Sequence, residues 1–104
     1  MAARVILTGA SSFTGLWIAE ALSRAGFEVT APLLRPRSEY EGVRLERVKR
    51  LEKAATVLFD RPFGSEPFLD VIRSSGGMDL LAHHAALAFY QARLLAAAEA
   101  AARR

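Results

Sequence analysis

The sequence contains no cysteine, and it has no apolar run that approaches the ~20 residues of a transmembrane helix. The absence of cysteine excludes disulfides, thiolate nucleophiles and cysteine-based zinc sites, and it suits a reducing compartment. The N-terminus passes directly into an expected strand, which leaves no room for a signal peptide. We therefore expect a protein of the cytoplasm that has no membrane partner.

Charge of one sign is also scarce outside a single segment. The 104 residues carry a net charge of +3, and hydrophobic residues make up 52% of them, as in a small globular domain. Residues 35–53 hold seven basic and four acidic residues, whereas the rest of the chain holds seven of each. The whole positive excess therefore lies in one segment, which calls for a functional reason.

Short apolar runs alternate with helical patterns along the chain. Because parallel strands need crossover connections, this alternation predicts a parallel sheet covered by helices. We expect one α/β domain over residues 1–104, a half or minimal Rossmann fold with four parallel strands in the order 3-2-1-4, truncated after its fourth βα unit. Pro32 lowers the expected regularity of the second strand because proline cannot donate a ladder hydrogen bond. The predicted strands are 4–8, 27–34, 56–59 and 79–83, and the predicted helices are 13–25, about 45–55, 66–75 and an alanine-rich segment from residue 85 onward.

The segment Thr-Gly-Ala-Ser-Ser-Phe-Thr-Gly at residues 8–15 lies between the first expected strand and the first expected helix. Gly9 permits a tight turn, and Gly15 lets the helix pack closely against the strand. The helix N-terminus then presents N–H groups to a pyrophosphate, and Ser11 and Ser12 can add hydroxyl donors. The alternative interpretation is a plain strand-to-helix connection that needs small residues.

This segment resembles the TGxxGFxG motif of the extended short-chain dehydrogenases/reductases, the NAD-dependent epimerase/dehydratase group, with Ser12 in place of the middle glycine. The segment Asp-Leu-Leu-Ala-His-His-Ala-Ala at 79–86 is similar to that family's DxVxHxAA segment. The resemblance covers residues 4–87 and implies an acidic residue near the adenine, here Asp60. It implies these further cofactor-binding residues: Gly9, Ser11, Ser12, Phe13, Thr14, Gly15, His84, Ala85 and Ala86.

Arg35 decides the expected cofactor. The residue that holds the ribose 2′-oxygen follows the glycine turn by about 20 residues, and counting from Gly15 leads to Arg35. A guanidinium suits a 2′-phosphate, which it can bind through two parallel hydrogen bonds. We therefore predict NADP rather than NAD. The alternative is that Arg35 and Arg37 are solvated loop charges.

The catalytic part of the family is missing from this chain. Family members use a Ser/Thr and a Tyr-x-x-x-Lys pair, but here Tyr40 is followed by Arg44 and Tyr90 by Leu94. We predict no catalytic residue, and therefore an NAD(P)-binding domain that performs no redox or epimerase chemistry alone. The alternative is a non-enzymatic Rossmann-like fragment or assembly module that does not use a cofactor.

The sequence also bears on three other kinds of partner: a metal ion, nucleic acid and a second copy of the chain. His83 and His84 are adjacent, so in a strand they point to opposite faces, and we predict no metal site. The basic segment 35–53 could contact nucleic acid, but it lacks interleaved aromatic residues and contains four acidic ones, so we do not expect this partner. The fourth strand would form an open edge of the sheet, and we expect a homodimer through it.

Overall fold

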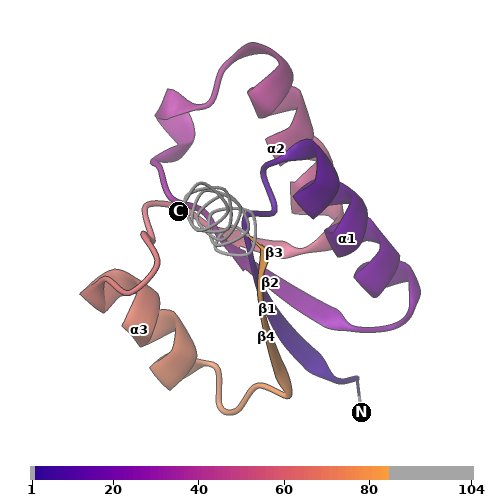
Figure 1. The fold of residues 1–104 in the computed structure, drawn as a ribbon, viewed down its shortest axis with the longest axis vertical. Helices are drawn as coiled ribbons and strands as arrows, with labels where there is room; N and C mark the ends of the chain where they lie inside the picture. Colours follow the sequence, from indigo (N-terminus) through magenta and orange to yellow (C-terminus); the bar gives the residue numbers. More distant parts are fainter. Residues whose placement is uncertain (1, 85–104) are drawn as a thin grey trace, which may run out of the picture.

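The computed structural model describes residues 2–84, and Figure 1 shows the arrangement of the elements within them. Strands and helices alternate from the N-terminus to the last strand. In chain order the elements are β1 (Arg4–Thr8), α1 (Phe13–Arg24), β2 (Glu28–Pro32), the 3-10 helix η1 (Arg37–Glu39), α2 (Gly42–Ala54), β3 (Thr56–Leu58), α3 (Glu66–Ser74) and β4 (Leu80–His83). The alanine-rich segment expected to form a last helix lies outside the described residues.

The four strands form one parallel sheet in the order β3-β2-β1-β4. The predicted fold class, an α/β half-Rossmann arrangement, is therefore confirmed. Helices α1 and α2 lie on one face of the sheet and α3 lies on the other (Figure 1). Because all strands run in the same direction, the loops that follow β1, β2 and β3 meet at one edge of the sheet, where β4 also ends. That edge collects the residues predicted to bind a cofactor.

Pro32 lies in β2 at a position where the strand no longer donates a backbone hydrogen bond to β1. The pairing of β2 with β1 ends at Ile6 and Thr30, whereas the pairing with β3 continues to Pro32 and Leu58. Backbone groups of successive residues in a strand point to alternate sides. The next N–H toward β3, that of Leu33, donates to the Leu58 carbonyl at 2.8 Å. The proline nitrogen therefore faces β1 beyond the end of their ladder, and the strand stays regular.

Serine side chains cap the starts of α1 and α3. The Ser12 hydroxyl accepts a hydrogen bond from the Gly15 N–H, and the Ser65 hydroxyl accepts one from the Phe68 N–H. Each cap satisfies an N–H group that has no carbonyl partner within its helix. Gly26 follows the C-cap of α1 with a φ of 94°, a left-handed conformation that favours glycine at the helix stop.

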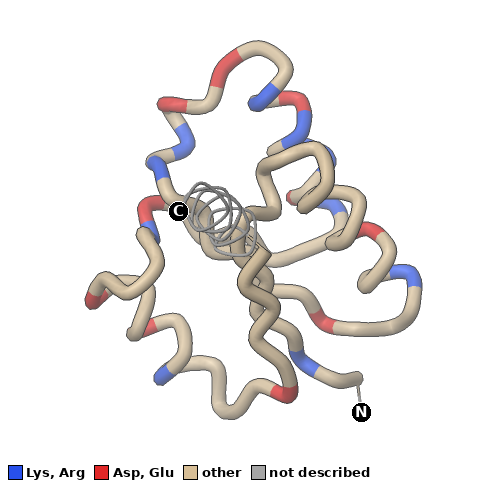
Figure 2. The backbone as a smooth tube through the Cα atoms, in the orientation of Figure 1, with Lys and Arg blue, Asp and Glu red and all other residues tan. Residues whose placement is uncertain are grey.

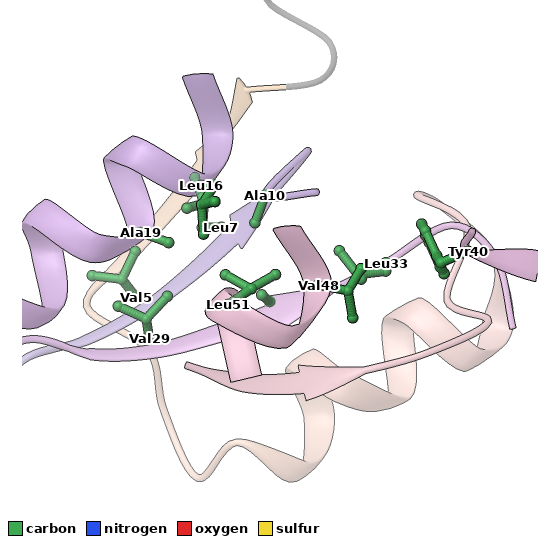
Figure 3. Close-up of a cluster of buried hydrophobic side chains, with 11 residues drawn as sticks. Val5, Leu7, Ala10, Leu16, Ala19, Val29, Leu33, Tyr40, Val48 and Leu51 are labelled. Carbon is green, nitrogen blue, oxygen red and sulfur yellow. The ribbon is translucent and has the colours of Figure 1, made fainter. Parts of the chain in front are cut away.

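The main core lies between the sheet and the pair of helices α1 and α2. Alternate residues of β1 and β2 point toward these helices, and Figure 3 shows their side chains meeting. Helix α3 lies on the other side of the sheet (Figure 1), and its Phe68 and Val71 are buried. The cluster of buried side chains in the main core consists of Val5, Leu7, Ala10, Leu16, Ala19, Val29, Ala31, Leu33, Tyr40, Val48 and Leu51.

No helix within residues 2–84 is long and apolar enough to cross a membrane.

Candidate functional site

The turn between β1 and α1 requires glycine at two positions for different reasons. Gly9 has a φ of 72°, which side chains other than glycine rarely adopt. Gly15 lies in α1, where a Cβ atom would come within 2.0 Å of the Gly9 carbonyl oxygen and 2.8 Å of the Ala10 Cα. The helix thus approaches the turn more closely than any side chain permits, which is the packing role predicted for Gly15.

Ser12 has a structural task within this turn. Its hydroxyl donates to the Gly9 carbonyl oxygen at 2.8 Å and accepts from the Gly15 N–H at 3.0 Å. We expected hydroxyl donors for a phosphate from both Ser11 and Ser12, but the Ser12 hydroxyl donates within the turn. A serine in place of the family's middle glycine therefore caps α1. Phe13 and Thr14, which open the helix, are exposed.

A hollow of about 430 Å³ lies beside the glycine turn, at the end of β2. We call it the arginine hollow, because three arginines line it and no acidic residue does. Arg47 is half-buried and its Nε donates to the Ser11 carbonyl oxygen at 2.9 Å, which ties α2 to the turn. The lining residues are Ser11, Ser12, Phe13, Leu34, Arg35, Tyr40, Arg44 and Arg47.

Arg37 differs from these arginines because it forms an ion pair. Arg37 Nη2 lies 3.2 Å from Glu52 Oε1, so its charge is partnered on α2. Within residues 2–84 the side chains of Arg35 and Arg44 make no ion pair. The Arg35 guanidinium therefore has no ion-pair partner within residues 2–84, whereas Arg37, a solvated loop charge in the alternative interpretation, is paired with Glu52.

Asp60 brings the loop after β3 against the loop after β2. Its N–H donates to the Arg35 carbonyl oxygen at 3.0 Å, and the Arg61 N–H donates to the Leu33 carbonyl oxygen at 2.8 Å. Asp60 has a φ of 56°, a left-handed conformation that aspartate tolerates better than most residues. The structure therefore places Asp60 and Arg35 side by side, at the edge of the sheet where the glycine turn also lies.

A second, more apolar hollow of about 240 Å³ adjoins the arginine hollow and shares Ser11 and Leu34 with it. It lies over the carboxyl ends of β1 and β2 and under the loop after β3. Its size and apolar walls suit a flat aromatic ring. The residues that line it are Thr8, Gly9, Ser11, Pro32, Leu33, Leu34, Arg61, Phe63 and Phe68.

The two histidines at the end of β4 differ in their surroundings. The His83 ring stacks on Phe63 with 3.6 Å between ring centroids, and its Nδ1 lies 2.7 Å from Thr8 Oγ1. Burial lowers the pKa of His83 below its ordinary value of 6.5 because a charged ring loses hydration there. His84 is half-buried at the end of the strand. No cluster of metal-binding side chains occurs among residues 2–84.

We expect the stability of the fold to decrease as the pH falls through about 6.5, the ordinary pKa of histidine. The unfolded chain takes up the His83 proton at a higher pH than the folded chain, so protonation favours unfolding until the folded pKa is passed. Denaturant unfolding at about pH 7.5 and about pH 5.5 checks this. The difference should shrink in His83→Gln and persist in His84→Gln; an equal difference in both variants would contradict the assignment to His83.

Sequence reasoning found Arg35, Asp60 and the glycine turn, but it missed Arg44, Arg47 and Phe63 as residues of this edge. The two arginines were counted within a basic segment, and their helical spacing of three was the signal that could have placed them together. Phe63 lies in a loop of no recognisable pattern. Ala85 and Ala86, predicted to pass against the cofactor, lie outside the described residues.

These features define a Rossmann-like parallel sheet with a glycine turn at its switch point. The fold is similar to that of a protein from Sinorhizobium meliloti 1021 assigned to the short-chain dehydrogenases/reductases, with a TM-score of 0.55 and 22% sequence identity. The match covers 78% of this chain and 38% of that one, so the chain corresponds to well under half of its neighbour's length. No family model matches the sequence, and a search of curated proteins found no significant match.

Proposed function

We propose that this chain binds NADP, with NAD as the weaker ligand, as the cofactor half of a reductase or of a protein of the epimerase/dehydratase group. The observation that carries the proposal is the arginine hollow beside the glycine turn. Dinucleotides bind Rossmann folds with the pyrophosphate at the N-terminus of the first helix and the ribose at the end of the second strand. The turn precedes α1 and Arg35 follows β2, while Arg44 and Arg47 on α2 line the same hollow, and this arrangement supports the proposal.

The described residues offer partners to the pyrophosphate, the adenine and the 2′-phosphate of the cofactor. N–H groups at the start of α1 favour the pyrophosphate, because the helix dipole adds positive potential there. The apolar hollow beside Asp60 suits the adenine, and Arg35 suits the 2′-phosphate, which carries close to two negative charges at neutral pH. We propose no catalytic step, since the chain has no Tyr-x-x-x-Lys pair.

Calorimetric titration of the purified chain with NADPH and then NADH tests this function. We expect NADPH to bind in the micromolar range, and Arg35→Ala to weaken NADPH about tenfold while it changes NADH little, because a charge-assisted contact to the phosphate is lost. Arg24→Ala is the matched control, because this exposed arginine ends α1 and lies away from the hollow. No heat with either cofactor at millimolar concentration, from a folded sample, would contradict cofactor binding.

The predicted homodimer stays a proposal of a different kind. In the described part of the chain β4 pairs only with β1, and Leu80 and Leu81 on it are exposed. An edge strand with exposed apolar residues favours association with another chain. Sedimentation at high protein concentration tests it, and a monomer there would contradict it.

A further inference from the structure

Helix α2 presents two arginines to the arginine hollow. Arg44 and Arg47 are three residues apart, so they lie on the same side of the helix, and both line the hollow with Arg35. Figure 2 shows the Lys and Arg positions gathered along α2 and the loop that precedes it, in the upper part of the view. This placement gives the positive excess of residues 35–53 a defined location beside the glycine turn.

Ion pairing distinguishes the hollow's arginines from Lys49 and Arg50 on the same helix, whereas Lys53, in the last turn of α2 and outside the hollow, forms no ion pair within residues 2–84 either. Lys49 Nζ lies 3.4 Å from Glu46 Oε1, and Arg50 Nη2 lies 2.6 Å from Glu20 Oε1 on α1. Arg44 and Arg47 form no such pair with any residue in 2–84, although α2 itself carries two glutamates. Arg35 and Arg44 are exposed and Arg47 is half-buried, so water screens much of their repulsion, but like charges along one hollow still raise the local positive potential, which attracts anions. The unpaired arginines therefore favour an anionic ligand.

Arg47 also acts on the turn itself. Its Nε donates to the Ser11 carbonyl oxygen at 2.9 Å. A guanidinium has five N–H donors, so the four on the terminal nitrogens are left for a ligand in the hollow. Ser11 lies in the loop that precedes α1, where the pyrophosphate would bind. One side chain thus connects the position of the turn to the electrostatics of the hollow.

We propose that the arginines of α2 complete the 2′-phosphate site: Arg44 binds the phosphate together with Arg35, and Arg47 is a positioning residue that holds the glycine turn in place. This inference rests on the proposed function, because it names which further residues select NADP. It assigns α2 a part in cofactor choice in addition to the end of β2. A 2′-phosphate that lies between the end of β2 and α2 can contact arginines from both elements, whereas Arg35 alone supplies a single positive charge.

Titrations of single variants with NADPH and NADH test the two roles separately. We expect Arg44→Ala to weaken NADPH about tenfold and to leave NADH within about twofold. Arg47→Ala should weaken both cofactors, because the turn loses its anchor. In Arg47→Gln the side-chain amide nitrogen stands the same number of bonds from Cα as the arginine Nε, so it can still donate to Ser11. That variant should recover NADH affinity, because the turn is anchored again. Its NADPH affinity should stay weakened, because the hollow has lost one positive charge.

Lys49→Ala is the matched control, since it removes one positive charge from the same helix outside the hollow. Circular dichroism and a thermal melt confirm that each variant is folded. If the wild-type chain prefers NADPH but Arg44→Ala keeps that preference, the α2 site is wrong and the proposed function stands. If Arg47→Gln binds NADH as weakly as Arg47→Ala does, the positioning role is wrong. If the wild-type chain binds neither cofactor, or binds a DNA duplex in preference to NADPH, both proposals are wrong.

Discussion

Replacing Gly15 by alanine is expected to destabilise the protein by about 3 kcal/mol or more, the range of severe overpacking. The added Cβ would lie 2.0 Å from the Gly9 carbonyl oxygen and 2.8 Å from the Gly9 carbonyl carbon. These are backbone atoms, which cannot rotate away as a flexible side chain could. The helix would have to move away from the sheet, and α1 contributes Leu16 and Ala19 to the core.

The sign of this effect makes the experiment decisive. Helix propensity alone favours alanine over glycine by about 1 kcal/mol at a helical position, so a stabilised variant would contradict the close approach of α1 to the turn. Gly26→Ala is the matched control, because Gly26 has a φ of 94° and open space around it. It should cost only the backbone strain of about 1–2 kcal/mol. Urea unfolding followed by circular dichroism measures both variants.

The second large effect is expected for Leu51→Ala, with a loss of about 2–5 kcal/mol. Leu51 is fully buried in the cluster between α2 and the sheet (Figure 3). Truncation removes its apolar contacts and leaves a cavity that surrounding side chains refill only in part. Domains of this kind have a total stability of about 5–15 kcal/mol, so the variant would lose a large share of it.

Leu34→Ala is the control for this prediction, because Leu34 is 59% exposed and lies outside the core cluster. We expect its unfolding midpoint to stay close to that of the wild type, since little apolar contact is lost. Equal losses in the two leucine variants would show that α2 is not packed as the structure has it.

Local sequence determined the elements of this fold and their order. Several features depend only on residues a few positions apart, so they can be recognised from the sequence. They are the helix caps at Ser12 and Ser65, the glycine turn before α1 and the apolar runs of the strands. The four predicted strands all occur, and their sheet order is the predicted one. The 3-10 helix after β2 was not predicted, because its residues Arg37–Glu39 carry no pattern beyond that of a loop.

Position in the sequence also indicated the edge of the sheet where a ligand would bind. Arg35 and Asp60 each follow a strand, and parallel strands end at a common edge. The sequence could not show that the Asp60 N–H bonds to the Arg35 carbonyl oxygen, because that contact joins loops 25 positions apart. It could not show either that Arg37 forms an ion pair with Glu52, which lies 15 positions further along the chain.

The sequence by itself determined the fold class, the glycine turn and the surplus of positive charge in residues 35–53. Only the tertiary structure decided which of those charges line the hollow beside the glycine turn. The physical reason is that the surroundings of a charge depend on its neighbours in space. The packing of α2 places Arg44 and Arg47 along the same hollow as Arg35, with Arg47 bonded to the Ser11 carbonyl oxygen, whereas Lys49 and Arg50 on the same helix pair with carboxylates.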